Sequence, residues 1–307
     1  MLARLGWSHN LLVTIVLTTL NVAAYLTEAL DSCLAQTQAD WELIIVDGGS
    51  TDGTLDIIGR YADPRIRLIH QTDNIGKLPG ALNLGLDAAR GEYLTWLQGD
   101  SRYHPQALAK MTVCLDQHPD VGHVYTDYWV TDAAGAPQSV VSTCEPEAIL
   151  LAKSDPCGVC FMIRRAVRQA VGPHDVAAYP TQDYDYRLRI AMQFRSYHLA
   201  EPLYYWRLHP ASLTGSRSWT IDAHNDVFIR LRLGLSTPRQ ARLDRAEIDM
   251  AYAFEHFYRA DFRPVPALVW SGLRGDPRFW RNRGVWAILA RSVRHILWGD
   301  APDKNLT

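Results

Sequence analysis

The chain has 307 residues, of which 48% are hydrophobic and 21% are charged, and its formal net charge is −2. This composition excludes disordered and fibrous proteins, and the length suffices for one large domain or two modest ones. The sequence contains no run of about 18 apolar residues, so a membrane-spanning helix is not expected. Five cysteines at uneven spacing do not make a disulfide framework, which favours the reducing cytoplasm as the location.

The near-neutral net charge of the whole chain conceals a difference in charge between its two parts. Residues 1–214 carry a net charge of −7 and residues 215–307 a net charge of +5, and such a break indicates a boundary. Between Arg274 and Arg294, six arginines stand against one aspartate, interleaved with apolar residues. This pattern is typical of a solvated helix face with buried aromatics, or of a segment, here 274–298, that is attracted to an anionic membrane surface. Nucleic acid binding is not expected, because no recognition motif accompanies the arginines.

The first 100 residues alternate between two kinds of apolar pattern. Strands are predicted at 12–17, 41–46, 65–70 and 92–97, and the segments between them carry apolar residues at helical spacing. Four strands joined by helices predict an α/β fold with a mostly parallel central sheet and helices on both faces. In such sheets, ligands bind beyond the carboxyl ends of the strands.

The rest of the chain divides into a mixed part and a helical part. The expected elements are a helix after Pro105, strands near 122–126 and 159–163, a helical segment after Asp183, a pair of strands ending at Trp206, and successive helices from Trp219 onward. We therefore predict an α/β domain over residues 1–214 and a C-terminal helical region over residues 215–307.

Polar turns follow the second and fourth predicted strands. The turn V-D-G-G-S-T-D-G-T begins at Val46, and its two glycines permit close backbone approach. Asp47 in this turn either caps the next helix or accepts a hydrogen bond from the N3–H of a uracil-type base. Asp100, which follows the fourth strand, is either a cap or a ligand of a divalent cation shared with substrate phosphates.

Two later segments carry a candidate base and a candidate ligand. Asp183 begins an amphipathic helix, where it acts either as a cap or as the general base that takes a proton from an attacking hydroxyl. His209 follows a strand and lies in the segment Y-W-R-L-H-P-A-S. A lone histidine is usually structural, but an imidazole at this place is able to join a divalent ion or donate to a diphosphate.

Six segments in order resemble the family 2 inverting glycosyltransferases, which have the GT-A fold. They are T-T-L-N at 18–21, the glycine-rich turn at 46–54, N-I-G-K-L-P-G-A-L-N-L-G-L at 74–86, the strand and turn at 89–100, T-Q-D at 181–183 and Y-W-R-L-H-P-A-S-L-T at 205–214. The resemblance covers roughly residues 12–214. Its specificity comes from the order of all six segments, since each segment alone is a weaker signal.

The resemblance implies a role for each candidate residue. Asp47 would bind the nucleotide base, with Thr19 and Asn21 lining the pocket, and Lys77 would lie near the base or phosphate. Gln98 would coordinate the metal ion or bind the ribose, and Asp100 and His209 would hold Mg²⁺ or Mn²⁺ and the diphosphate. Asp183 would be the catalytic base. The implied reaction moves a hexose-type sugar, with inversion, from a nucleotide diphosphate sugar, expected to be UDP-linked. The expected acceptor is a hydroxyl of a cell-envelope glycan or a lipid-linked glycan, which suits a cytoplasmic enzyme with peripheral contact at the inner membrane surface.

Several positions depart from the family pattern. Gln98 replaces the first acid of the D-x-D motif, Ser101 follows its last acid, Gln182 replaces the glutamate of the later acid motif, and Gly48 removes a second carboxylate near the base. These departures leave open the alternative that the chain is a non-catalytic relative that only binds nucleotide sugars. A sugar-nucleotide nucleotidyltransferase is a further alternative, but it needs a glycine-rich basic loop where residues 18–21 stand.

Overall fold

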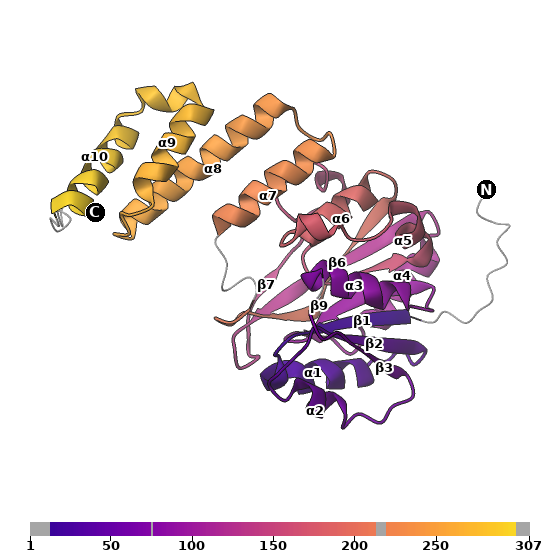
Figure 1. The fold of residues 1–307 in the computed structure, drawn as a ribbon. Coiled ribbons are helices and arrows are strands. Elements are labelled where there is room, and N and C mark those ends of the chain that lie inside the picture. Colours follow the sequence, from indigo (N-terminus) through magenta and orange to yellow (C-terminus); the bar gives the residue numbers. More distant parts are fainter. Residues whose placement is uncertain (1–12, 75, 213–218, 299–307) are drawn as a thin grey trace. The chain divides into compact units, whose positions relative to one another are not determined.

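The computed structural model describes residues 13–74, 76–212 and 219–298 of the chain. It divides into two compact units, Met1–Arg217 and Ser218–Thr307. Strands and helices together build the first unit, and the described elements of the second are helical (Figure 1).

The elements of the first unit begin with the expected alternation of strands and helices. Its strands are β1 Val13–Thr19, β2 Trp41–Asp47, β3 Ile66–His70, β4 Tyr93–Gln98, β5 Arg102–Tyr103, β6 Val121–Thr131, β7 Pro137–Val141, β8 Phe161–Arg164 and β9 Arg195–Arg207. Its α-helices are α1 Ala23–Leu34, α2 Thr54–Ile58, α3 Lys77–Asp87, α4 Ala107–Gln117, α5 Arg165–Val171 and α6 Gln182–Ala191, with short 3-10 helices η1 Pro146–Ala148 and η2 Val176–Ala178.

One sheet joins the strands that the structure describes. Its order is β3-β2-β1-β4-β8-β6-β9-β5, with β7 beside β6. The half formed by β3, β2, β1 and β4 is entirely parallel, as predicted, and β8 then joins β4 in the antiparallel sense. Parallel strands place their carboxyl ends at one edge, so the polar turns after β1, β2 and β4 meet there.

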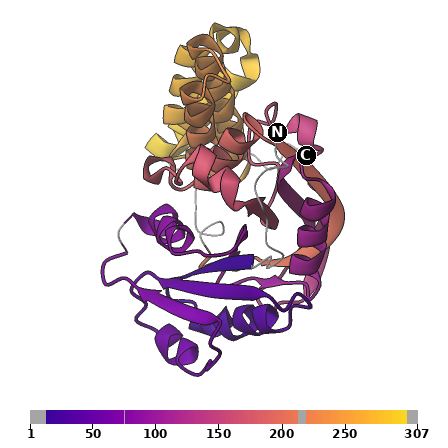
Figure 2. The ribbon, with the colours of Figure 1, turned by 90° about the vertical axis from the view of Figure 1, so that its right-hand side faces the viewer.

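Helices cover both faces of the sheet, as the burial of β1 and β2 on both faces requires. Leu17 and Leu43 pack with α1, α2 and α4 on one face, whereas Val16 and Ile44 pack with α3, α5 and α6 on the other. Figures 1 and 2 show α1 and α2 on the opposite side of β1–β3 from α3. Burial on both faces explains why apolar residues lie on both faces of β1 and β2, and the polar Thr14 and Glu42 within them are buried and hydrogen-bonded to each other.

The prediction of a pair of strands ending at Trp206 is wrong, because β9 is a single strand of 13 residues. It runs parallel to β6, and its last part also pairs with β5. The register against β6 shifts on both sides of the pair Asp127 and Pro202. A bulge of this kind tolerates a residue without an N–H, so Pro202 does not end the strand.

The second unit consists of α7 Trp219–Arg232, α8 Pro238–Tyr258, α9 Val265–Gly275, the 3-10 helix η3 Pro277–Arg281 and α10 Arg283–Trp298. Its core contains buried residues of three helices: Met250, Ala253, Val265, Val269, Leu273, Val285, Ile288 and Leu289. Pro238 lies in the first turn of α8, where a missing N–H costs no hydrogen bond. None of the described helices has the length and apolar character needed to cross a bilayer.

The apolar residues of α10 divide into two groups. Val285, Ile288 and Leu289 are buried in the core of the helical unit. Ile296 and Leu297, one turn or more further along, are 47% and 63% exposed. The first half of the helix is therefore a packing element, and the second half presents apolar side chains at the surface.

Candidate active site

Strand register places four polar residues side by side at the carboxyl edge of the parallel strands. Thr19 of β1 lies opposite Asp47 of β2, and Asp47 lies opposite His70 of β3. On the other side of β1, Thr18 lies opposite Gln98, the last residue of β4. The sheet thus assembles the predicted nucleotide pocket from residues up to about 80 positions apart without any long loop.

Asp47 is fully buried, and protein donors occupy both of its carboxylate oxygens. Oδ1 accepts from the hydroxyls of Thr19 (3.0 Å) and Ser50 (2.5 Å). Oδ2 accepts from the backbone N–H groups of Gly49 and Ser50 and lies 3.0 Å from Nδ1 of His70. Burial alone would raise the pKa of Asp47, but the hydrogen bonds from Ser50, Thr19 and Gly49 outweigh it and lower that pKa. The carboxylate therefore stays ionised and holds the turn.

The glycine-rich turn is braced against the start of α1. Asn21 accepts from the Thr51 backbone through Oδ1 (2.8 Å) and donates its own N–H to the Ser50 hydroxyl. Asp52 accepts from the Ala23 N–H at the start of α1 and also from the N–H and hydroxyl of Thr54 at the start of α2. One carboxylate thus bonds to backbone N–H groups at the starts of both α1 and α2.

The glycines of the turn are needed for close backbone approach. Gly49 has φ +91°, and a Cβ there would lie 3.0 Å from the Thr72 carbonyl oxygen. A Cβ on Gly48 would lie 3.1 Å from Oδ1 of Asn74. The space that a side chain at position 48 would need is thus occupied by the Asn74 amide.

Asp100 and His209 come together at the end of β4. Nε2 of His209 lies 3.2 Å from Oδ2 of Asp100, and the Ser101 hydroxyl donates to Oδ1. The Asp100 and His209 side chains are 17% and 7% exposed. Tyr25 of α1 packs against the imidazole with ring centroids 4.5 Å apart. A carboxylate and an imidazole at this distance fit a Mn²⁺-type ion, which accepts both ligand types.

The protein supplies only part of a metal coordination shell. Within residues 13–74, 76–212 and 219–298, no group of three or more His, Cys, Asp or Glu side chains is arranged to hold a metal ion. A divalent ion at Asp100 and His209 would accordingly need further oxygen ligands from a substrate, such as a diphosphate.

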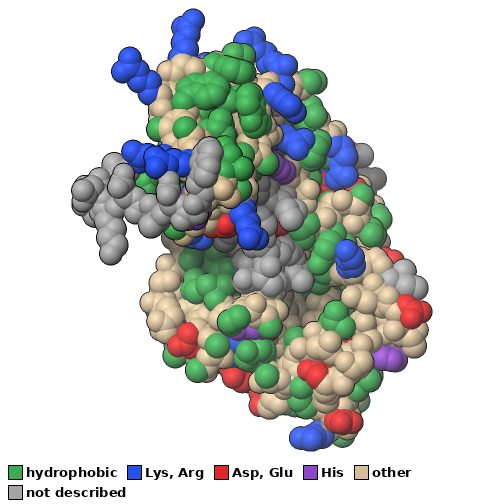
Figure 3. Space-filling model, turned by 60° about the vertical axis from the view of Figure 1, so that its left-hand side comes forward, with side chains coloured by type: hydrophobic (Ala, Val, Ile, Leu, Met, Phe, Trp, Pro, Cys, Tyr) green, Lys and Arg blue, Asp and Glu red, His purple; other side chains and the backbone are tan. Residues whose placement is uncertain are grey.

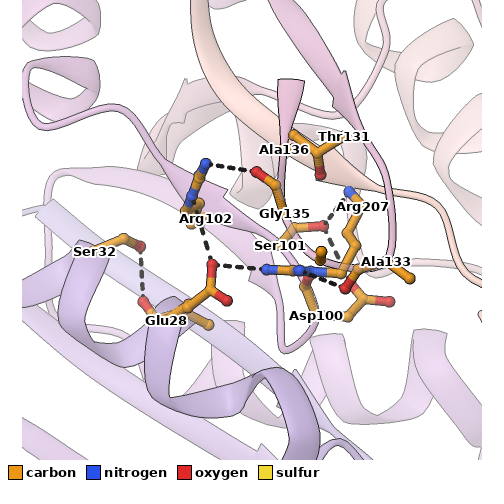
Figure 4. Close-up of polar contacts among 12 residues, drawn as sticks. Glu28, Ser32, Asp100, Ser101, Arg102, Thr131, Ala133, Gly135, Ala136 and Arg207 are labelled. Atoms are coloured by element: carbon orange, nitrogen blue, oxygen red, sulfur yellow. Dashed lines mark hydrogen bonds and ion pairs between the residues drawn. The ribbon is translucent and has the colours of Figure 1, made fainter. Parts of the chain in front are cut away.

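A buried arginine fixes the backbone around this pair. Arg207, at the end of β9, is 3% exposed. Its Nε donates to the Asp100 carbonyl (2.9 Å), Nη1 to the Ala133 carbonyl (2.8 Å) and Nη2 to Oε2 of Glu28 (2.7 Å). Figure 4 shows these bonds linking α1, the turn after β4, the β6–β7 turn and β9. The geometry of Asp100 is therefore set by three distant segments.

Lys77 begins α3 and lies over an aromatic ring. Its Nζ is 4.6 Å from the centroid of Tyr179, four residues before Asp183. Lys77 itself is exposed and has φ +53°, directly after the left-handed Gly76. This cation–π contact brings the predicted phosphate-binding lysine to the segment that leads into α6.

Asp183 lies in the first turn of α6 and is half-buried. Its Oδ2 accepts from Nε2 of Gln182 at 3.0 Å. Asp185 in the same turn is fully buried and paired with Arg189 (2.9 Å). Of these two residues, Asp183 is the less buried one, and the helix dipole favours its charge.

An aromatic contact ties α6 to the strand that ends at Gln98. The rings of Trp96 and Tyr186 lie with centroids 5.9 Å apart, nearly edge to face. Trp96 precedes Gln98 by two residues and Tyr186 follows Asp183 by three. The start of α6 is thus anchored over the same face of β4 on which Gln98 ends the strand.

Sequence reasoning missed three residues of this region. His70 was expected only as the end of a strand, although parallel pairing with β2 could have predicted its place beside Asp47. Arg207 has no signal beyond its place in the Y-W-R-L-H-P-A-S segment, and Glu28 has none because it lies 179 positions from Arg207. These residues support the predicted ones rather than replace them.

Comparisons with known proteins agree with this geometry. The sequence model of Glycosyl transferase family 2 matches residues 14–172. The chain is 33% identical to the putative glycosyltransferase EpsE of Bacillus subtilis (strain 168) over 236 residues, 73% of this chain and 84% of EpsE. It is 34% identical over 179 residues to a PGL/p-HBAD biosynthesis glycosyltransferase of Mycobacterium bovis (strain BCG / Pasteur 1173P2), covering 57% of this chain and 68% of that protein.

Solved structures share the fold across nearly the whole chain. S. aureus TarS 1–349 in complex with UDP-GlcNAc superposes with a TM-score of 0.62 at 16% identity, covering 95% of this chain and 93% of that one. The mannosyltransferase PcManGT of Pyrobaculum calidifontis, in complex with GDP-Man and Mn²⁺, superposes with a TM-score of 0.57 at 21% identity, covering 94% and 88%. With a GT-A fold and a family match over more than half its length, the chain belongs to glycosyl transferase family 2 and is a glycosyltransferase.

Proposed function

We propose that this glycosyltransferase transfers a hexose-type sugar from a UDP-sugar to a hydroxyl acceptor of a cell-envelope glycan or glycolipid, with inversion. The observation that carries the proposal is the Asp100–His209 pair at the carboxyl edge of the parallel strands, 3.2 Å apart. A carboxylate and an imidazole at that edge suit the diphosphate of a nucleotide sugar. The donor-bound TarS and PcManGT structures support this class of donor.

The base of the nucleotide is proposed to bind at Asp47, between Thr19 and Asn21. All the acceptor positions of Asp47 that the structure describes are taken by protein donors, so a uracil N3–H has to replace one of them. His70 is the candidate, because its side chain is 41% exposed and it bonds to Asp47 from the rim. Gln98, two residues before Asp100, is left to contact the ribose or the metal.

Inverting transfer needs a base on one side of the sugar and charge stabilisation on the other. Asp183 accepts the proton of the acceptor hydroxyl as that oxygen attacks the anomeric carbon. Asp100 and His209 would hold Mg²⁺ or Mn²⁺, and the ion would supply charge stabilisation for the leaving diphosphate. Lys77 adds a positive charge beside the phosphates. Residues 1–214 are proposed to carry all of these groups, with residues 215–307 as a helical addition.

Contact with a membrane surface is proposed for the helical unit. Trp270, Trp280 and Trp286 form a cluster in which each ring centroid lies within 6.5 Å of the others. These side chains are 44%, 49% and 37% exposed. On the face drawn in Figure 3, hydrophobic side chains of this unit are bordered by arginines. Aromatic and basic side chains together are typical of surfaces that meet an anionic bilayer.

The test of the donor proposal is UDP release by purified protein. The protein is incubated with UDP-glucose, UDP-galactose or UDP-GlcNAc and Mn²⁺, and the anomeric configuration of any glycoside formed is read by NMR. We expect UDP release with at least one donor, its loss in Asp100→Asn, and its retention in the matched control Asp56→Asn, which changes an exposed aspartate of α2. Donor binding without UDP release for every donor would support the non-catalytic alternative, absence of donor binding would contradict the proposal, and retention of configuration would contradict inversion.

A further inference from the structure

A groove with basic walls lies entirely within the helical unit. It has a volume of about 390 Å³ and runs over α8 between α7 and α9. That volume falls in the range of ligand sites, roughly 300–1,000 Å³. Its lining combines apolar side chains of α7 with arginines of α8 and α9.

One part of the groove is apolar. Val227, Phe228 and Leu231 lie on one face of α7, at spacings of one and four residues. Val227 is buried, whereas Phe228 is 51% exposed. An exposed phenylalanine beside buried apolar neighbours offers a hydrocarbon surface to a ligand. Arg245 lies over the Phe228 ring, 4.5 Å from its centroid, and so joins the apolar part to the basic part.

The other part of the groove is basic, and its charge is not neutralised by its neighbours. Arg242 and Arg274 line it from α8 and α9, and within the described part of the chain neither forms an ion pair. Arg278, outside the groove, differs in that it pairs with Asp276 and Glu247. Exposed guanidinium groups without a carboxylate are suited to bidentate contacts with a phosphate.

The acidic residue of the groove has its own partners. Oδ2 of Asp249 accepts from the Ser271 hydroxyl at 2.5 Å, and Oδ1 lies 3.0 Å from Nε2 of His224. Asp249 is 4% exposed. Its charge is thus directed mainly to Ser271 and His224, with an attraction to Arg245, and Arg242 and Arg274 leave the groove positive.

We propose that this groove binds a phosphorylated lipid, with the phosphate head on Arg242 and Arg274 and the first part of the chain against Phe228 and Leu231. A free anion would use the arginines but leave the apolar wall bare, and an uncharged lipid would leave the arginines unused. The role of this lipid as the carrier of the acceptor rests on the proposed function, whereas the binding itself does not.

The experiment measures binding by calorimetry with the full chain and no sugar donor present. The probes are n-decyl phosphate below its micelle-forming concentration, decanol and inorganic phosphate. We expect decyl phosphate to bind at least about tenfold more tightly than either of the others, because each supplies only one half of the contacts. Because no donor is used, the result does not depend on whether the protein transfers sugar.

Matched variants separate the groove from general charge. The double variant Arg242→Gln, Arg274→Gln should weaken decyl phosphate binding by about tenfold or more, and Phe228→Ala should weaken it without changing the weak binding of inorganic phosphate. The control, Arg263→Gln with Arg291→Gln, removes the same charge from exposed positions outside the groove. The proposal would be overturned if both double variants lost the same affinity for decyl phosphate. It would also be overturned if inorganic phosphate bound as tightly as decyl phosphate, or if decyl phosphate did not bind.

Discussion

Nη2 of Arg207 donates to Oε2 of Glu28 at 2.7 Å and so joins the end of β9 to α1 across 179 positions of sequence. The same guanidinium also donates to the Asp100 carbonyl oxygen. Arg207 itself lies two residues before His209. The two proposed metal ligands are therefore positioned by a residue that touches neither of their side chains in the bonds described. Their spacing depends on this arginine as much as on the turns that carry them.

Replacing Arg207 by lysine should loosen that spacing. A lysine keeps the charge but lacks the planar fork that reaches Glu28, Ala133 and Asp100 together. Each buried acceptor left unbonded costs about 1–3 kcal/mol, so urea unfolding should show a loss in that range. Half-maximal activity should also need more Mn²⁺. A variant that is destabilised but has an unchanged Mn²⁺ requirement would show that Arg207 serves stability alone.

Substituting Asp183 by asparagine should abolish transfer and leave nucleotide binding intact. A general base typically contributes about 10²- to 10⁴-fold to rate, and the amide cannot accept the proton. Turnover and calorimetric UDP binding are the measurements, with Asp175→Asn as the control for a nearby capping aspartate. Near-normal turnover of Asp183→Asn would remove this residue from the mechanism.

Transfer should require a divalent cation, and more of it than an enzyme with a complete D-x-D motif needs. Gln98 is neutral, which leaves Asp100 as the side-chain carboxylate of the motif, and the imidazole of His209 suits Mn²⁺ better than Mg²⁺. Activity titrated with each ion after chelation should therefore show a lower half-saturating concentration for Mn²⁺. Full turnover in excess chelator would contradict this account of the Asp100–His209 pair.

The stability provided by Asp47 should depend on pH in the acidic range. Its hydrogen bonds lower the pKa of the carboxyl in the folded state, whereas the unfolded value is about 3.9. The contribution is thus complete above the unfolded pKa and is lost as the pH falls through the lower folded value. The difference in unfolding free energy between the wild type and Asp47→Asn should shrink below about pH 4. A difference that is the same at pH 7 and pH 3 would rule this out.

Binding to vesicles should depend on anionic lipid and on salt. Each basic residue near such a surface contributes about 1 kcal/mol and is screened within a Debye length. Co-sedimentation should fall steeply as salt rises, and the double variant Trp280→Ser, Trp286→Ser should bind less at every salt concentration. Equal partitioning onto neutral and anionic vesicles, or none onto either, would exclude the membrane contact of residues 274–298.

The parallel half of the sheet could be predicted because its strands carry a strong local signal. The runs that end near Asp47 and Gln98 are apolar on both faces, so neither needs knowledge of its neighbours to be recognised. The pairing of Asp100 with His209 followed from the order of motifs shared with the family. In the structure the two side chains lie 3.2 Å apart, and their chemical roles stay predictions.

The remaining features depend on contacts that leave little trace in the sequence. The two-residue strand β5 exists only because it pairs with Tyr204 and Tyr205 of β9. The bulge at Pro202 requires knowledge of the partner β6. Glu28 lies on the exposed side of an amphipathic helix, where a glutamate ordinarily needs no explanation. Such residues become identifiable only when the segments they join are seen together.

The core of the helical unit is made from its own helices, with Met250, Val269 and Ile288 among its buried residues. Substitutions in that core change none of the residues of the sheet edge that carries Asp47 and Asp100. Under the proposal that the helical unit binds the lipid carrier of the acceptor, selection for a new carrier and selection for a new donor act on different residues of one chain. Over evolutionary time, such a chain is expected to keep its donor while its helical unit diverges, so descendants with one donor would serve several lipid carriers.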